Sequence, residues 1–240
     1  MSNTELSATI AKSIRDAIVE GRLAVDDRLP SESELAEQFE VGRSTVREAL
    51  KRLAAQSLIR TERGAFGGAF VQRLSYADAQ AQHVTTSTLL LSMNEVSFVT
   101  ACQARFALER ACVDLACAHR QAADLADMRA EITRQSQPDL SDEGFCASDV
   151  RLHRALVDSA QNPVLSYQLA GAVEAMQPLM NMITFSDRSR SEITRYHTMM
   201  VDAVEARQPP KVVRALECLE IYTLELGRGK ILARKQTPAR

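Results

Sequence analysis

The sequence predicts a mostly α-helical protein in two parts, a small N-terminal domain of helices with one β-hairpin and a larger C-terminal bundle that is all-α. Three observations support this fold class. Ala, Leu, Arg and Glu are plentiful, only 5% of the 240 residues are aromatic and Trp is absent, which favours helices. Residues 57–63 and 69–73 have a strand pattern on either side of a Gly-rich tip. Beyond residue 95, apolar residues recur at helical spacing.

The stretch 35–53 predicts two short helices joined by a tight turn at 40–42. Each helix has an apolar face, formed by Leu35, Ala36 and Phe39 and by Val46, Leu50 and Leu53. Gly42 is expected to allow the sharp reversal of the chain, and Ser44 to cap the second helix. The opposite side of that helix is basic and carries Arg43, Arg47, Lys51 and Arg52. This arrangement is a helix-turn-helix, whose second helix enters the DNA major groove by its N-terminal end.

The segments on both sides of this motif complete a DNA-binding domain. A helix over 6–19 precedes it, and Ser31 followed by Glu34 predicts a capping box at the start of its first helix. A hairpin with its tip at 64–68 follows directly, and a hairpin in that position is a wing. We therefore predict a winged helix-turn-helix domain over residues 1–73.

The remainder of the chain is predicted to contain only helices. Residues 74–94 form a connecting segment with a helix at 76–91. An all-helical domain over 95–227 is expected to have helices at 95–118, 122–136, 142–161, 163–185, 189–207 and 209–226. Residues 228–240 are polar and basic, so we expect a disordered tail there.

The charge is distributed unevenly, although the net charge is only −2. Residues 1–73 hold 11 Lys or Arg and 11 Asp or Glu, and so are neutral. Within 42–63, however, six basic residues face two acidic ones, a local excess of 6 − 2 = +4. This basic patch coincides with the second helix of the motif, as expected for a nucleic-acid-binding surface. Residues 74–240 hold 18 basic and 20 acidic residues, so the larger domain is not expected to bind phosphates.

Other sequence signals bear on the location of the protein. No apolar run approaches the length of a membrane span, and the N-terminus has no signal-peptide pattern. The five Cys residues are scattered without CxxC spacing, which argues against a disulfide framework or a zinc finger. These features are typical of a cytoplasmic protein.

Five polar residues of the C-terminal domain lie on the apolar faces of its predicted helices: Arg105, Glu109, Asp149, His153 and His197. A buried, unpaired carboxylate is costly, so Asp149 is expected to be paired, protonated or bound to a metal. An Asp and a His spaced i, i+4, together with a His from another helix, can converge on a divalent metal. The alternative is a hydrogen-bonded polar cluster that lines a metal-free pocket. Arg105 can also pair with Glu109, one turn further along its helix.

Both predicted domains resemble those of a known family. Residues 6–73 resemble the winged-helix domain of the GntR family of bacterial transcription regulators, through the segments 29–36, 41–50 and 63–71. Residues 95–226 are similar to the helical effector domain of the FadR subgroup, called FCD. The segments that carry this second similarity are 105–109, 149–153, 162–165 and His197 with 201–204.

The resemblance implies a set of DNA-contacting residues. Arg43 and Arg47 are expected to contact guanine edges or phosphates, and Ser44 and Thr45 the DNA backbone. Lys51 belongs to the same face, and Arg63 and Gly64 lie at the tip of the wing, where a minor-groove or phosphate contact is expected. The alternative is that these charges form only a solvated helix face.

The resemblance also implies an effector site with a metal. Metal-binding relatives use an Asp and three His, and this chain matches three of these positions, with Asp149, His153 and His197. The fourth ligand falls on Leu219, which cannot coordinate, and a helix turns the neighbouring Cys218 about 100° away. The remaining set suits Zn²⁺, Ni²⁺ or Mn²⁺.

Two further residues have an expected role at the effector. By resemblance, Arg105 clamps a carboxylate of the effector, since a guanidinium matches a carboxylate bidentately. Asn162 either contacts the effector or forms a helix C-cap.

Taken together, these features predict a DNA-binding transcription regulator. We expect a homodimeric repressor that binds a palindromic operator and is released by a small organic acid, whether a sugar acid, a hydroxy acid or an acid of aromatic catabolism. One alternative is a non-haem metal enzyme, because two His and one carboxylate can hold iron. The sequence, however, contains no nucleophile elbow, phosphate loop or dinucleotide fingerprint, so we expect no enzymatic activity. A second alternative is a DNA-binding protein that senses no ligand.

Overall fold

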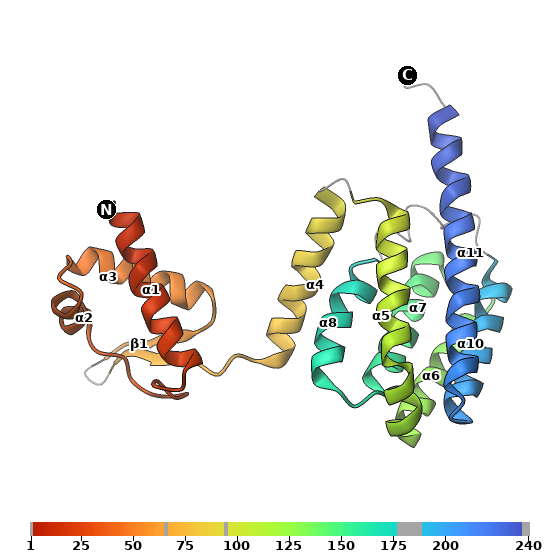
Figure 1. Cartoon of the computed structure of the whole chain (residues 1–240), viewed down its shortest axis with the longest axis horizontal. Helices are drawn as coiled ribbons and strands as arrows, with labels where there is room; N and C mark the ends of the chain where they lie inside the picture. Colours follow the sequence, from red (N-terminus) through yellow and green to blue (C-terminus); the bar gives the residue numbers. More distant parts are fainter. Residues whose placement is uncertain (1, 65–66, 94–95, 177–188, 237–240) are drawn as a thin grey trace. The chain divides into compact units, whose positions relative to one another are not determined.

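The computed structural model describes residues 2–64, 67–93, 96–176 and 189–236, with side chains described up to residue 227. The chain divides into two compact units, Met1–Ala79 and Gln80–Arg240 (Figure 1). The fold is mostly helical, with one β-hairpin in the N-terminal unit and a helical bundle in the C-terminal unit.

The N-terminal unit contains three helices and the hairpin. Its elements are α1 (Asn3–Val19), α2 (Glu32–Gln38), α3 (Arg43–Ala55), β1 (Ile59–Glu62) and β2 (Gly68–Val71). The strands are antiparallel, with Ile59 opposite Val71 and Glu62 opposite Gly68. The apolar faces of α1, α2 and α3 meet with the inner face of the hairpin in one core, which includes Ile10, Ile14, Leu35, Val46, Leu53 and Ile59. A helix-turn-helix followed by a wing is therefore confirmed.

The turn of the motif differs in detail from the prediction. Glu40, not Gly42, adopts the left-handed backbone conformation, with φ 53°. The carbonyl of Gly42 accepts the first helical hydrogen bond, from the N–H of Val46 at 3.3 Å, which makes Gly42 the N-cap of α3. Ser44 lies inside the first turn, so the prediction that it caps the helix is wrong. The capping box predicted for α2 is present, with the N–H of Glu34 donating to Ser31 Oγ at 3.2 Å.

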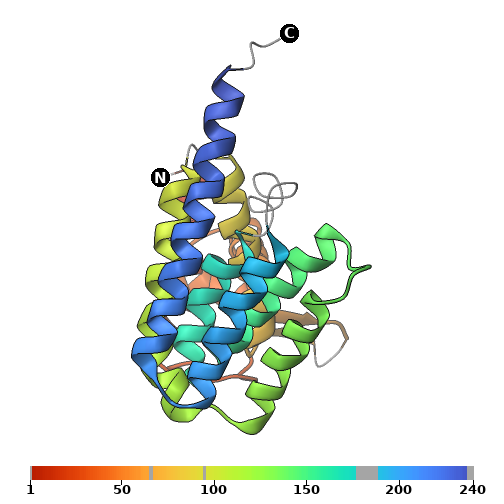
Figure 2. The same cartoon turned by 90° about the vertical axis from the view of Figure 1, so that its right-hand side faces the viewer.

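The C-terminal unit is a bundle of helices, preceded by α4, which begins in the N-terminal unit. The described helices are α4 (Tyr76–Met93), α5 (Phe98–His119), α6 (Ala122–Gln135), α7 (Asp142–Asp158), α8 (Pro163–Glu174), α10 (Arg190–Glu205) and α11 (Pro209–Gln236). Figure 2 shows α10 and α11 side by side. The main core lies between α5, α7, α10 and α11 and includes Phe106, Phe145, Leu152, Leu156, Met200 and Leu216. Among the residues that the structure describes, no helix has the length and apolarity that a bilayer span requires.

Two helix ends differ from the prediction by more than a turn. The structure ends α8 at Glu174, whereas the sequence pattern predicted a helix to 185; residues 177–188 lie outside the described part of the chain. In contrast, α11 continues past the predicted end at 226 to Gln236. Gly227 lies within this helix and not at its end. It lets α11 pack closely on the ring of Phe98, which a Cβ at this position would overlap.

Candidate metal centre and nucleic-acid interface

The helix α3 presents the residues predicted to contact DNA. Arg43, Ser44, Arg47 and Lys51 are all exposed. They are held on the outer face of α3 because Val46, Ala49 and Leu53 are fully buried on the inner face. The wing adds Arg63 and Gly64, which are exposed as well; Gly64 has φ 115°, a conformation that favours glycine. The rest of the predicted wing tip, residues 65 and 66, lies outside the described residues.

Thr45 is placed differently from its exposed neighbours. Its side chain is only 4% exposed, and its hydroxyl donates to Asn3 Oδ1 of α1. The helix turns by about 100° per residue, which carries Thr45 from the outer face of α3 to the inner one. The hydroxyl of Thr45 therefore joins α3 to α1 and does not face a phosphate.

Several basic side chains of this surface have acidic partners. Arg47 donates from Nη2 to Glu32 Oε2 at 2.7 Å and from Nε to Glu32 Oε1 at 3.1 Å. The hydrogen bond from Arg47 lowers the pKa of Glu32 below its ordinary value. Lys51 Nζ lies 3.7 Å from Glu48 Oε2, one turn earlier on the same helix. These pairs orient the side chains but are solvent-exposed, so their contribution to stability is small.

The C-terminal unit contains a buried group of potential metal ligands. Asp149 and His153 come from successive turns of α7, and His197 comes from α10. One ligand atom from each of the three lies within 4.8 Å of the others. The three residues are 8%, 1% and 0% exposed, respectively. The predicted convergence of these residues is therefore confirmed.

Hydrogen bonds to neighbouring helices fix which nitrogen of each imidazole faces the group. His153 Nδ1 lies 2.6 Å from Glu109 Oε2, and His197 Nδ1 lies 2.8 Å from Gln135 Oε1. Both oxygens act as acceptors, so each Nδ1 carries the proton and each Nε2 keeps a lone pair. The Nε2 of His197 lies 3.3 Å from Asp149 Oδ1 and has no hydrogen-bond partner. Two imidazole lone pairs beside a carboxylate form a donor set that fits a divalent cation.

The pKa shifts of His197 and Asp149 agree with this assignment. Burial lowers the pKa of His197, and the opposing effect of Asp149 is smaller, so His197 is neutral near pH 7. Burial would raise the pKa of Asp149, but the interactions of its carboxylate with His197, His153 and Arg105 outweigh burial and hold that pKa well below its ordinary value. Asp149 is therefore ionised and available as a ligand.

Arg105 lies beside this centre and is 2% exposed. Its Nε donates to Glu109 Oε1 at 2.7 Å, and its Nη2 lies 3.6 Å from Asp149 Oδ2 without forming a hydrogen bond. The structural pair with Glu109 is thus present, and one guanidinium nitrogen remains unpartnered. Glu109 bridges Arg105 and His153, and the two partners keep its pKa below the ordinary value despite its burial.

Leu219, Cys218 and Asn162 lie outside the centre, as the sequence predicted for the first two. Leu219 is 3% exposed and is part of the apolar core, and Cys218 is half-buried. Asn162 is the N-cap of α8, since its Oδ1 accepts from the N–H groups of Val164 and Leu165 at 3.0 and 3.1 Å. The alternative that Asn162 is a C-cap is therefore wrong, because α7 already ends at Asp158.

Gln135 is a functional candidate that no sequence pattern singled out. It is 3% exposed, and its Oε1 lies against His197 Nδ1. No spacing pattern signals it, because the last turn of a helix has no complete apolar repeat around it. Glu109 was predicted to point inward, but its contact with His153 joins two helices and depends on their packing.

Comparison with known proteins identifies both units. Residues 6–71 match the family described as bacterial regulatory proteins, gntR family, and residues 100–219 match the FCD domain. RmpR of Mycobacterium gastri is 31% identical over 209 residues, which cover 86% of this chain and 74% of RmpR. The galactonate operon transcriptional repressor of Escherichia coli (strain K12) is 29% identical, over 78% of this chain and 81% of the repressor.

A solved structure agrees with the fold. The Streptococcus agalactiae GntR structure superimposes with a TM-score of 0.55 at 20% identity and covers 92% of this chain and 99% of that chain. The matched families consist of regulators of transcription and not of enzymes. The chain is a DNA-binding transcription regulator of the GntR family, in the FadR-like subgroup with a C-terminal FCD domain.

Proposed function

We propose that this regulator is a repressor that leaves its operator when a small organic acid binds beside a metal ion in the C-terminal unit. The observation that carries the proposal is the buried centre of Asp149, His153 and His197, with the unpartnered Nη2 of Arg105 next to it. A bundle that served only to hold two DNA-binding domains together would gain nothing from such costly groups.

The metal site is formed by Asp149 Oδ1 and the Nε2 atoms of His153 and His197. Zn²⁺, Ni²⁺ or Mn²⁺ suits these ligands, and the open positions are left for water or an effector oxygen. The charge balance supports an anionic effector. Arg105 contributes one positive charge and Glu109 and Asp149 two negative charges, so the centre has a net charge of −1, and a divalent cation changes it to +1.

The effector is proposed to be a carboxylate that binds the metal and Arg105 together. The guanidinium supplies one donor that no protein group uses, and a carboxylate satisfies it. A sugar acid is one possible class, because the similar protein from E. coli is named for galactonate. Hydroxy acids and acids of aromatic catabolism also contain a carboxylate, and the panel of acids tested below includes them. Asn162 is not included, because its Oδ1 already caps α8.

On DNA, we propose that Arg43, Ser44, Arg47 and Lys51 enter the major groove, and that Arg63 and Gly64 contact the backbone or minor groove. The exposure of these residues supports this assignment. A palindromic operator and a homodimer follow, because two half-sites need two copies of α3. Effector binding would then shift the equilibrium between two arrangements of the dimer, only one of which spaces the two copies for the operator.

The test measures operator release and metal content together. An operator selected from random DNA is labelled, and its binding is followed by fluorescence anisotropy while a panel of carboxylic acids is added. We expect one class of acid to release the DNA from protein that holds one metal ion per chain, and not from chelator-treated protein. Asp149→Asn should bind the operator but lose both the metal and the release. If the chelated protein is released as readily as the metal-loaded one, the metal has no part in sensing.

A further inference from the structure

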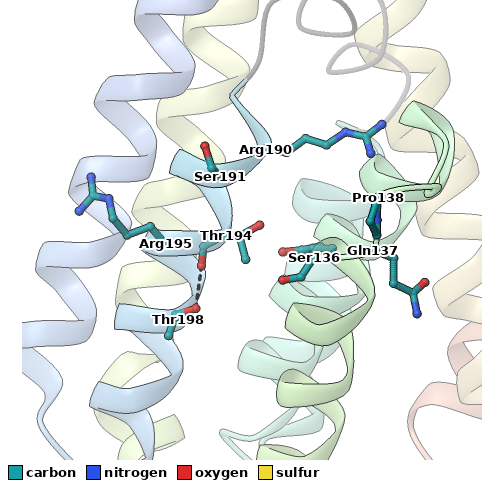
Figure 3. A pocket seen from close by; sticks show the side chains of 9 residues that line it. Ser136, Gln137, Pro138, Arg190, Ser191, Thr194, Arg195 and Thr198 are labelled. Atoms are coloured by element: carbon teal, nitrogen blue, oxygen red, sulfur yellow. Dashed lines mark hydrogen bonds between the residues drawn. The ribbon is translucent and has the colours of Figure 1, made fainter.

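A cleft lies between the end of α6 and the start of α10, outside the Asp149 centre (Figure 3). Its volume is about 540 Å³, in the range of small-molecule sites. In Figure 3, Thr194 of α10 and Ser136 face each other across it. Its lining is formed by Gln135, Ser136, Gln137, Pro138, Arg190, Ser191, Thr194, Arg195 and Thr198.

The lining is rich in neutral hydrogen-bonding groups, and its charges already have partners. Arg190 donates to the carbonyl of Leu140 and to Asp142 Oδ1, both at 2.6 Å. Arg195 donates to Glu192 at 2.8 Å and points away from the gap in Figure 3. The hydroxyls of Ser136 and Thr198 donate to the carbonyls of Ile132 and Thr194 at 3.0 and 2.8 Å. What remains for a ligand is the hydroxyl of Thr194, the amide groups and the acceptor lone pairs of Ser136 and Thr198. This chemistry matches a chain of hydroxyl groups better than an apolar tail or a multiply charged anion.

Gln135 gives this cleft a second, independent indication of a ligand. It lines the cleft, its side chain is 97% buried (3% exposed), and its Nε2 has no hydrogen-bond partner. An unpartnered buried donor is unfavourable unless a ligand or water satisfies it. The same amide group holds His197 Nδ1 at 2.8 Å through Oε1. The side chain of Gln135 therefore lines the cleft and also holds the imidazole of His197, a ligand of the proposed metal site.

We propose that this cleft is a second ligand site, for a small polyhydroxylated molecule such as a polyol or the hydroxylated chain of a sugar acid. The ligand bonds with Ser136 and Thr194 across the cleft and accepts from Gln135 Nε2. With Nε2 satisfied, the amide is fixed with Oε1 toward His197, which keeps the Nε2 of His197 free for a metal. Ligand in the cleft and metal at the Asp149 centre thus strengthen each other. Only this coupling rests on the proposed function; binding in the cleft does not.

The first experiment measures binding alone, on metal-free full-length protein. Sorbitol, gluconate and hexanoate are titrated, and backbone amide shifts are followed by NMR. Sorbitol is neutral and cannot use a carboxylate clamp. We expect sorbitol and gluconate to shift the amides of Ser136 and Thr194, and hexanoate to leave them unchanged. Equal shifts with hexanoate, or no shift at these amides with sorbitol, would overturn the proposal.

Variants locate the bound molecule. The double variant Ser136→Ala and Thr194→Val removes two hydroxyls without adding bulk, and should weaken sorbitol binding about tenfold, the effect of about 1.4 kcal/mol in lost hydrogen bonds. Thr133→Val, at an exposed position of α6, is the matched control and should bind as the wild type does. Unchanged affinity in the double variant would place the ligand elsewhere.

The second experiment measures the coupling. The affinity for Zn²⁺ is determined by competition with a chelating dye, with and without saturating sorbitol. We expect sorbitol to tighten Zn²⁺ binding severalfold in the wild type, within the 10–100-fold range of effects seen when second-shell partners are changed. Gln135→Glu keeps an acceptor for His197 but loses the donor, so it should bind Zn²⁺ without responding to sorbitol. A response equal to that of the wild type would refute the coupling, whereas failure of Zn²⁺ to bind at all would refute the metal site and leave the cleft result intact.

Discussion

Replacing Glu109 with Gln tests whether the charges around the buried centre stabilise one another. Glu109 is fully buried and bridges Arg105 Nε at 2.7 Å and His153 Nδ1 at 2.6 Å. Gln has nearly the same volume and still offers an oxygen to His153. The change therefore removes a charge without creating a cavity.

The magnitude follows from what remains around Arg105. Breaking a buried ion pair by neutralising one partner costs about 3–5 kcal/mol, because the other charge stays buried. In Glu109→Gln, Arg105 keeps Asp149 at 3.6 Å, without a hydrogen bond. We therefore expect the lower end of this range, a loss of about 3 kcal/mol in the free energy of unfolding. The further change Arg105→Met removes the unpaired charge and should recover at least about 1 kcal/mol.

The assay is urea unfolding followed by far-UV circular dichroism, because the chain contains no Trp. A chelator is present throughout, so that metal binding does not add to the stability. Glu217→Gln is the control, since Glu217 pairs with the exposed Arg214 at 3.2 Å and should change stability by no more than about 1 kcal/mol. If Glu109→Gln costs no more than this control, or if the effects of Arg105→Met and Glu109→Gln simply add, the buried network does not act as a unit.

Three further predictions follow. Arg47→Ala should abolish operator binding in a gel shift. Its circular dichroism spectrum should be unchanged, because Arg47 is exposed and pairs only with Glu32 among the described contacts. Arg22→Ala, at an equally exposed position in a loop, should bind the operator normally. Gly171→Ala should destabilise the protein by about 1–3 kcal/mol in thermal unfolding, because its Cβ would lie 2.5 Å from His83 Nε2 and 2.6 Å from Ser87 Oγ. Combining it with His83→Ala and Ser87→Ala should relieve the loss, and an unchanged melting temperature in Gly171→Ala would contradict the packing of α4 on α8. The pKa of Glu109 is depressed in the folded state, so its carboxylate stabilises the fold above the ordinary pKa of about 4.5, and this stabilisation is lost as the pH falls through the folded-state pKa. The melting temperature of Glu109→Gln should therefore fall less steeply between about pH 5 and 3 than that of the wild type. Parallel curves would refute the depressed pKa of Glu109.

Most of the helices and the wing could be predicted from the sequence because their signals are local. The apolar repeat of α3, the capping box at Ser31 and Glu34 and the alternation around the hairpin each lie within a few residues. The end of α8 at Glu174 was missed, because the apolar pattern continues past it. Gly227 shows the opposite case, a glycine that serves close packing and marks no helix end.

The sequence by itself determined the fold class, the outer face of α3 and the inward position of Asp149, His153 and His197, because helical periodicity places side chains on one face or the other. Only the tertiary structure decided the rest. In the folded chain Thr45 lies on the inner face of α3 and contacts Asn3. His153 is hydrogen-bonded to Glu109 and His197 to Gln135. The Nη2 of Arg105 and the Nε2 of Gln135 have no hydrogen-bond partner. These contacts join side chains from different helices, and such contacts depend on how the helices pack and rotate against each other, which no repeat within a single helix records.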